Sequence, residues 1–220
     1  MVEPDGEQML RLIEQAGRLC YKSEDKITDT SHEEFVRRAI DIGHHSIIEH
    51  ANCSVRMITD RGVTHEIVRH RIASYSQEST RYCNYGTEKF GGGITVILPV
   101  EFYDTFDIMY GESSVGVSGY DARFNDWNTA MVYSEKAYLD MLAHGCSPQL
   151  ARSVLPNSLK TEIIMTANVR EWRHFFTLRC SKKAHPQMRD LACSMLLGFS
   201  RRIPIIFDDI KDKVIEEEVK

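Results

Sequence analysis

The sequence predicts a single domain of the α+β class, with long helices and a few short strands. Its 220 residues suit one domain, or one domain with an insertion. Apolar side chains recur at helical spacing over several long segments, whereas a few short segments alternate between apolar and polar residues or form brief apolar runs. The composition, with 42% hydrophobic, 9% aromatic and 27% charged residues, is typical of a soluble globular protein.

Two helices are expected ahead of the first strand. Residues 6–20 carry apolar side chains at a helical period. A second helix over residues 32–42 follows a capping box, in which Ser31 is the N-cap and Glu34 lies three residues later. Gly43 gives this helix a suitable end, because glycine readily adopts the left-handed conformation of a C-terminal cap.

The middle of the chain predicts two strands, a helix and an insertion. Residues 52–59 alternate as in a strand with one buried face, and residues 61–71 return to a helical period. Residues 94–98 form an apolar run that ends at Pro99, which favours another strand. Glycine and serine are frequent within residues 103–121, so we expect a flexible surface insertion there.

The C-terminal half of the chain is expected to be mainly helical. Its apolar periodicity, caps and prolines mark the boundaries of the elements. The expected elements are a long helix over residues 124–142, a short helix from Pro148, a strand over residues 160–167, a helix capped by Asn168, and a last main helix from Pro186 before an acidic tail.

Charge and cysteine content disfavour several classes of protein. The net charge of −5 argues against a protein that coats a nucleic acid polymer, because such a protein needs a broad basic face. No run of about 18 apolar residues occurs, so no membrane span is expected. The cysteines have no Cys-x-x-Cys spacing, which predicts reduced thiols in a cytoplasm and not a disulfide framework. They are Cys20, Cys53, Cys83, Cys146, Cys180 and Cys193.

One polar stretch, residues 69–82, has the residue types of an anion-binding site. Arg69, His70 and Arg71 are consecutive, and Arg81 lies near the end of the stretch. Planar phosphates or carboxylates offset the mutual repulsion of such arginines best. With the hydroxyl and amide groups in between, the stretch predicts a site for a phosphorylated, ring-bearing small molecule. A simpler account places the first two arginines on the last turn of a helix, where the macrodipole favours cations, but it leaves Arg81 unexplained.

Residues 44–50 offer a different kind of site. They contain three histidines and a glutamate, which are potential metal ligands. No His-x-x-x-His helix or cysteine pair completes a recognisable ligand set, so we expect no metal. These side chains are then polar groups beside another site.

Four motifs in the same order resemble those of the flavin-dependent thymidylate synthases. Residues 69–79, with Arg-His-Arg followed by seven residues and a serine, resemble the family signature. Residues 43–50, Gly-His-His-Ser-Ile-Ile-Glu-His, are similar to an earlier block, and residues 152–156, Arg-Ser-Val-Leu-Pro, to a later one. Residues 168–179 resemble the C-terminal Asn-x-Arg…Leu-Arg segment. The resemblance runs from about residue 10 to residue 207, which makes it specific.

The resemblance implies a fold, an assembly and a reaction. The fold is α+β, with a mixed, largely antiparallel sheet packed with long helices, in a homotetramer that binds FAD where subunits meet. The reaction converts dUMP to dTMP, with methylenetetrahydrofolate as the carbon donor and NADPH as the reductant of FAD. The hydride that reaches the pyrimidine then comes from reduced FAD, and no enzyme cysteine attacks the base.

The resemblance also assigns residues to the two ligands. Gln77 would lie between FAD and dUMP, and Arg152 would reach the nucleotide from a neighbouring subunit. The family commonly has glutamine at position 66, so Glu66 is expected to bond a ribose hydroxyl or to pair with an arginine. The FAD residues are Ser46, Arg69, His70, Arg71, Ile72, Gln77, Asn168, Val169, Arg170 and His174. The dUMP residues are Glu66, Ile67, Val68, Arg69, Gln77, Glu78, Ser79, Thr80, Arg81, Arg152 and Arg179.

Arg179 is the expected catalytic residue. A guanidinium against the uracil N3–O region favours the deprotonated, polarised ring, which raises the nucleophilicity of C5. Arg179 stays protonated, so it acts electrostatically and not as a base. Ser79 as a covalent nucleophile is disfavoured, because no base is identifiable beside it. Without the resemblance, Arg152 and Arg179 fit solvated helix faces better than a site.

Two alternative functions stay open. One is a non-catalytic nucleotide-binding or sensor protein that kept the fold, and the other is a histidine-rich metal hydrolase. Bound FAD with turnover of dUMP distinguishes the enzyme from the sensor, and stoichiometric zinc would favour the hydrolase.

Overall fold

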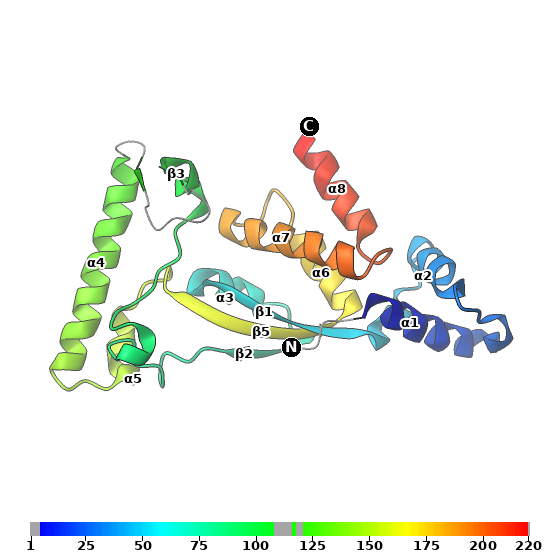
Figure 1. The fold of residues 1–220 in the computed structure, drawn as a ribbon, viewed down its shortest axis with the longest axis horizontal. Coiled ribbons are helices and arrows are strands. Elements are labelled where there is room, and N and C mark those ends of the chain that lie inside the picture. The colour runs from blue at the N-terminus through cyan, green and yellow to red at the C-terminus, as the bar shows by residue number, and fades with distance from the viewer. Residues whose placement is uncertain (1–4, 108–115, 118–120, 220) are drawn as a thin grey trace. The chain divides into compact units, whose positions relative to one another are not determined.

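The computed structural model describes residues 5–107, 116–117 and 121–219 (Figure 1). The contacts divide the chain into two compact units, which are described separately. Unit 1 comprises Met1–Val55, His70–Tyr75 and Met165–Lys220, and unit 2 comprises Arg56–Arg69 and Ser76–Ile164. Each unit therefore gathers segments that are far apart in the sequence.

A three-stranded antiparallel sheet has the strand order β1-β5-β2, which with the many helices confirms the α+β class. β1 spans Asn52–Asp60 and β5 spans Lys160–Asn168, so both predicted strands are confirmed. Alternate side chains of these two strands are buried, as a sheet packed on one face requires. β2, Ala73–Gln77, is a strand that the sequence did not predict. Its residues, Ala-Ser-Tyr-Ser-Gln, lack the apolar alternation that indicates a strand.

The helix α6, Val169–Arg179, supplies the centre of unit 1. Asn168 caps it, because the Asn168 side chain accepts a 2.9 Å hydrogen bond from the backbone N–H of Glu171, as predicted. The other helices of unit 1 are α1 Gly6–Tyr21, α2 Ser31–Asp41, α7 Pro186–Arg202 and α8 Asp208–Val219, with short 3₁₀ helices at Glu24–Lys26 and His45–His50.

The long helix α4, Ala122–Ala143, belongs to unit 2. Its Tyr138 is fully buried and packs against Tyr85, with ring centroids 6.0 Å apart. None of the helices within the described ranges has the length and apolar character needed to cross a membrane. Unit 2 also contains the helices α3 Arg61–Ile67 and α5 Pro148–Ala151, the 3₁₀ helices Glu88–Phe90, Val100–Thr105 and Arg152–Val154, and the antiparallel pair of β3 Phe106–Asp107 with β4 Gly116–Val117. The remainder of the insertion expected at residues 103–121, namely residues 108–115 and 118–120, lies outside the described residues.

The second helix forms as predicted, but its expected cap is wrong. Thr30 occupies the N-cap position of α2, and no side chain makes a capping hydrogen bond there. The Ser31 hydroxyl instead donates to Oε2 of Glu14 on α1 at 2.9 Å and accepts from the backbone N–H of Thr28 at 2.8 Å. A tertiary hydrogen bond to α1 thus replaces the local cap. Gly43 has φ +80°, the left-handed conformation that its expected role requires.

Two other local predictions are also wrong. α3 ends at Ile67 with Val68 as its C-cap, so Arg69 and Arg71 lie just beyond the helix and not on its last turn. Residues 94–98 form an isolated antiparallel bridge between Val96 and Leu159, and not a strand. Proline at position 99 has no N–H to donate, so it cannot extend this pairing.

Trp172 should contribute more to stability than its surface neighbours on α6. Trp172 is fully buried, and the centroid of its ring lies 5.0 Å from that of Phe199 and 5.5 Å from that of Phe175. Its Nε1–H also donates a 3.2 Å hydrogen bond to the Cys53 carbonyl. We expect Trp172→Ala to lower the free energy of unfolding by about 3–5 kcal/mol in urea denaturation. Leu178→Ala is the control, because Leu178 is 49% exposed and should cost about 0.5 kcal/mol or less. Equal losses in the two variants would contradict this packing.

Candidate functional site

His70 is the buried centre of a hydrogen-bonded cluster in unit 1. It is 5% exposed, and its ring packs against that of Phe175 with centroids 4.9 Å apart. Nδ1 of His70 lies 3.1 Å from Oε1 of Glu171, and Nε2 lies 3.2 Å from Nε of Arg179. The His70 carbonyl accepts a 2.6 Å hydrogen bond from the Tyr75 hydroxyl. The signature histidine and the predicted catalytic arginine are therefore in direct contact.

The partners of His70 determine where its proton lies. An arginine Nε–H can only donate, so Nε2 of His70 is the acceptor and carries no proton. The proton is then on Nδ1, which donates to the Glu171 carboxylate. Burial lowers the pKa of His70, the Arg179 and His174 charges lower this pKa further, and the hydrogen bond and charge of Glu171 oppose them. At neutral pH the ring is accordingly a neutral Nδ1–H imidazole.

The same cluster has the donor types of a metal site. Among the described residues, ligand atoms of His70, Glu171 and His174 all lie within 4.8 Å of one another. Both ring nitrogens of His70 are already hydrogen-bonded, however, and one of them faces a guanidinium. This arrangement suits a hydrogen-bond network better than a cation. The histidines of residues 44–50 do not belong to the set.

A cavity of about 850 Å³ in unit 1 contains two predicted FAD residues, Ser46 and Arg170. Its size falls in the usual range for ligand sites, about 300–1,000 Å³. Cationic side chains and two aromatic rings also face it, which is a suitable lining for an anionic, ring-bearing ligand. Two of the further lining residues, His44 and His45, belong to the block of residues 43–50, whose histidines were expected beside another site, whereas the other four carry no motif. These further lining residues are Arg18, Tyr21, Phe35, Arg38, His44 and His45.

Local contacts hold the charged residues around this cavity. Nη1 of Arg170 lies 2.5 Å from Oε1 of Glu49, and this pair is about half exposed. The Arg18 guanidinium lies 4.7 Å from the centre of the Phe35 ring and also pairs with the buried Glu14. The block of residues 43–50 and the start of α6, far apart in the sequence, thus meet at one surface of unit 1.

The other predicted FAD residues have varied surroundings. Val169 is fully buried, and its N–H donates to the Ala51 carbonyl at 2.9 Å, so it anchors the start of α6. His174 is exposed and meets His70 edge to face at 5.6 Å. Arg71 and Ile72 are exposed, and Ile72 keeps 68% of its surface accessible. Exposed side chains such as these are available to a ligand.

The predicted dUMP segment, residues 77–81, lies in unit 2. Gln77 donates to the hydroxyls of Thr64 at 3.0 Å and Thr161 at 3.3 Å, so its amide is anchored at the end of β2. The Ser79 carbonyl accepts from the N–H groups of Tyr82 and Cys83, which closes a tight turn. The segment therefore changes from strand to turn at the point where the nucleotide is expected.

Three side chains around this turn provide cationic and hydroxyl groups. Nε of Arg81 donates to Oε1 of Gln149 at 2.9 Å, and Arg81 is exposed. Nη1 of Arg152 lies 3.5 Å from the buried hydroxyl of Thr80. Within one chain, Arg152 thus lies beside the predicted nucleotide segment.

Residues 66–69 surround the end of α3. The Glu66 carbonyl accepts from the Arg69 N–H at 3.2 Å. Ile67 is fully buried, so any contact with a substrate would involve its backbone. Val68 and Arg69 are exposed.

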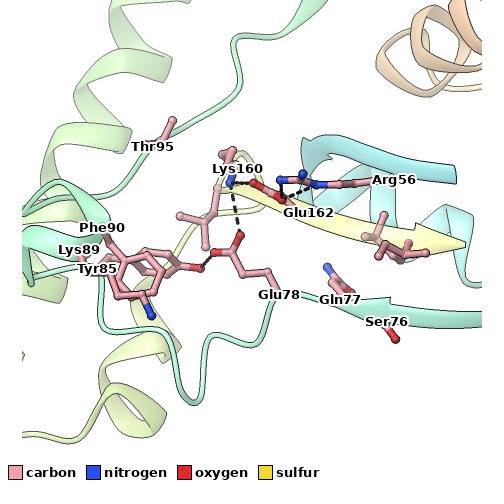
Figure 2. Close-up of a pocket in the computed structure, with 13 residues that line it drawn as sticks. Arg56, Ser76, Gln77, Glu78, Tyr85, Lys89, Phe90, Thr95, Lys160 and Glu162 are labelled. Carbon is pink, nitrogen blue, oxygen red and sulfur yellow. Dashed lines mark hydrogen bonds and ion pairs between the residues drawn. The ribbon is translucent and has the colours of Figure 1, made fainter. Parts of the chain in front are cut away.

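Glu78 lines a second cavity, of about 630 Å³, within unit 2 (Figure 2). Its carboxylate accepts a 2.6 Å hydrogen bond from the Tyr85 hydroxyl and lies 3.4 Å from Nζ of Lys160. Lys160 also pairs with Glu162 at 2.6 Å, and Arg56 donates to Glu162 through Nε at 2.8 Å. Two carboxylates and two cations give this network no net charge. The Glu78 carboxylate is thus bonded within the chain, where it fixes the start of the Ser79 turn, and the contact of Glu78 with dUMP stays a prediction.

The Glu162 ion pairs should give unit 2 an acid-sensitive contribution to stability. Hydrogen bonds from Lys160 and Arg56 hold the pKa of Glu162 below its ordinary value of 4.5. The contribution is therefore complete above pH 4.5 and is lost as the pH falls through the lowered pKa of the folded state. We expect Glu162→Gln to cost about 1 kcal/mol of unfolding free energy at neutral pH, and this difference from the wild type should shrink in acid.

Denaturation of both proteins across this range of pH measures the effect. Asp140→Asn is the control, because Asp140 pairs with Lys136 on the exposed surface of α4. That variant should change stability less at every pH. A cost of Glu162→Gln that grows in acid would contradict the ion-pair assignment.

Comparisons with known proteins agree with the motifs. A family model described as thymidylate synthase complementing protein matches residues 5–205. A flavin-dependent thymidylate synthase of Geobacter sulfurreducens is 34% identical over 213 residues, which is 94% of this chain and 82% of that protein. One from Mycobacterium tuberculosis H37Rv is 33% identical over 207 residues, 91% of this chain and 79% of that protein. A crystal structure of the Helicobacter pylori flavin-dependent thymidylate synthase, complexed with FAD and dUMP, is similar with a TM-score of 0.70 and 25% identity, over 91% of this chain and 94% of that one.

The fold and the ordered motifs define an α+β enzyme. The match over residues 5–205 and the relatives above 30% identity then show which one. The chain belongs to the flavin-dependent thymidylate synthase family, as the resemblance indicated.

Proposed function

We propose that this chain converts dUMP to dTMP, with bound FAD, methylenetetrahydrofolate as the carbon donor and NADPH as the reductant. Membership of the family supports the reaction, and the Helicobacter pylori relative complexed with FAD and dUMP supports the two ligands. The observation that carries the proposal is the Arg179 guanidinium, which the buried His70 ring holds in one orientation.

The residues around the larger cavity fit FAD. Arg18, Arg38 and Arg170 offer cations for a pyrophosphate, and the Tyr21 and Phe35 rings offer faces for flat groups. Ser46 adds a hydroxyl, and the exposed signature residues extend the same kind of surface within unit 1. When bound, FAD supplies hydride transfer, chemistry that no amino acid side chain offers.

The turn after β2 is suited to the nucleotide phosphate. Arg81 and Arg152 provide guanidinium groups, and Ser79 and Thr80 provide hydroxyls. Gln77 is the last residue of β2, and its anchored amide would lie at the boundary between the nucleotide and the cofactor. Substrate binding thus needs the turn to be rigid, and the Glu78 network supports that rigidity.

Arg179 would act on the uracil ring. A guanidinium beside N3 and its neighbouring oxygen stabilises negative charge on the ring, and this charge makes C5 a better nucleophile toward the carbon donor. The neutral His70 accepts from Nε and so orients the Arg179 guanidinium. Arg179 therefore acts as a fixed cation and takes part in no proton transfer.

Two buried cysteines, Cys53 and Cys180, are unsuited to act as a thiolate nucleophile. Burial raises the pKa of Cys53 to about 12. A hydrogen bond with Cys193, together with burial, raises the pKa of Cys180. Both thiols are thus held in the unreactive protonated form at neutral pH.

The proposal includes a homotetramer whose sites are shared between subunits. In that assembly FAD lies where subunits meet, and the folate and NADPH reach it as co-substrates. Size-exclusion chromatography with light scattering tests the assembly.

Cofactor content separates the proposed enzyme from its alternatives. We expect the purified chain to be yellow, with the visible absorbance of oxidised FAD, and addition of dUMP to perturb that absorbance. A colourless protein that takes up no added FAD would overturn the proposal. Stoichiometric zinc in place of flavin would instead favour a metal hydrolase.

A further inference from the structure

We propose that Glu171 is a positioning residue that holds the Arg179 guanidinium in place through His70. The inference rests on the proposed role of Arg179 at the substrate. It assigns a function to a glutamate that no motif or comparison singles out, in the first turn of α6.

Three side chains form a continuous line from the interior of unit 1 toward its surface. Oε1 of Glu171 lies 3.1 Å from Nδ1 of His70, and Nε2 of His70 lies 3.2 Å from Nε of Arg179. The side chains of Glu171 and His70 are 8% and 3% exposed, whereas Arg179 is partly exposed. The buried Glu171 carboxylate is thus linked through His70 to Arg179, the member of the line that a substrate can reach.

The helix places both ends of this line on one face. Glu171, Phe175 and Arg179 follow one another at intervals of four residues, so their side chains lie along the same side of α6. The His70 ring lies between Glu171 and Arg179 and packs on the Phe175 ring, with the two ring centroids 4.9 Å apart. The Tyr75 hydroxyl donates to the His70 carbonyl and holds the His70 backbone. The ring therefore has little freedom to turn away from either partner.

The hydrogen bonds have one consistent direction. Arg179 donates from Nε, so His70 must present an unprotonated Nε2 and donate from Nδ1, and Glu171 must accept. The N-terminal end of α6 favours the negative charge of Glu171, and Asn168 completes that helix end. Without an acceptor at Glu171, the His70 proton can move to Nε2, where it faces the Arg179 donor. The guanidinium then loses the His70 acceptor, and its orientation is less constrained.

Protonation of His70 has the same effect on Arg179. The groups that face the His70 ring are Glu171, His174 and Arg179 from α6, and Tyr75 on β2 contacts the His70 backbone. The Glu171 charge raises the pKa of His70, so its removal lowers that pKa further. Glu171→Gln should therefore move the acid limb of the kcat profile to lower pH, although its amide oxygen still accepts from Nδ1–H.

Kinetics of two Glu171 variants and one control test the proposal. We expect Glu171→Ala to lower kcat about 100-fold, because small misplacements of a catalytic group have effects of that size. Glu171→Gln should lower kcat about 10-fold, with the shifted acid limb, since the conservative amide partly rescues the alignment. FAD content and the KM for dUMP should change by about twofold or less in both variants, because Arg179 would act on the ring and not on the bound phosphate. Asp209→Asn is the control. Asp209 on α8 pairs with Arg173, which lies on α6 like Glu171, and loss of this pair should leave kcat and its pH profile unchanged.

The ¹⁵N chemical shifts of the His70 ring test the relay independently of turnover. We expect the Nδ1–H tautomer in the wild-type protein at neutral pH. An Nε2–H tautomer or a cationic ring would overturn the relay, even if the enzyme is active. Unchanged kcat in Glu171→Gln, a variant expected to fold, would also overturn it. A wild-type protein with the expected tautomer but no turnover of dUMP would sink the proposed function and leave the hydrogen-bond relay standing.

Discussion

Arg179→Ala is expected to retain FAD and to lose about 100- to 1,000-fold in kcat. Removal of one preoriented group that stabilises transition-state charge typically has an effect of this size. Arg179 donates to His70 through Nε and is not one of the residues that line the larger cavity of unit 1, so cofactor content should not depend on it. Steady-state kinetics together with the flavin absorbance of the purified variant measure both properties.

Two further variants sharpen this result. Arg179→Lys keeps the charge but loses the Nε–H that His70 accepts, so it should recover only a small part of the activity. Arg201→Ala removes an exposed arginine of α7 in the same unit and should behave as the wild type. An Arg179→Ala protein that loses FAD but keeps its activity per bound flavin would contradict the assigned role.

Arg81→Ala should raise the KM for dUMP by about 10- to 100-fold and change kcat much less. A charge-assisted hydrogen bond to a phosphate contributes about 1.5–3 kcal/mol, and a contact made equally in the ground and transition states appears in KM. Gln149 holds the Arg81 guanidinium at 2.9 Å beside the Ser79 turn, so the group is already oriented before the nucleotide binds.

Matched variants test whether the effect belongs to this site. Arg81→Lys retains the charge without the planar fork and should lose less affinity than alanine. Arg123→Ala removes an exposed arginine of unit 2 that pairs with Asp121, and the KM for dUMP should stay unchanged. An Arg81→Ala enzyme with the wild-type affinity for dUMP, measured by titration, would count against the phosphate assignment.

Apolar patterns predicted the main elements of the fold well. The strands β1 and β5, and the helices α1, α4 and α6, follow directly from the spacing of their apolar side chains. β2 escaped prediction because its polar residues are held by pairing with β5, a contact that no local pattern contains. Ser31 was misassigned for the same kind of reason, since a partner on another helix replaced its local cap.

The candidate site was predictable as a set of residues but not as a network. The motifs identified His70 and Arg179, which lie 109 residues apart, as members of one site. Their direct contact, and the buried Glu171 behind them, depend on how α6 packs against residues 70–75. Arg18 and Arg38 carry no motif and join the larger cavity only because α1 and α2 fold against residues 43–47. The bonds of Glu78 to Tyr85 and Lys160 likewise depend on packing that no local pattern contains, and its contact with dUMP stays a prediction.

Release of tritium from C5-labelled dUMP is the most direct test of the proposed function. Replacement of the C5 hydrogen by the new carbon must release this label to water. With methylenetetrahydrofolate, NADPH and FAD present, the wild-type chain should release tritium in proportion to the dTMP formed, and Arg179→Ala should release almost none. A yellow, dUMP-binding protein that releases no tritium would contradict the account and identify the chain as a nucleotide-binding protein without thymidylate synthase activity.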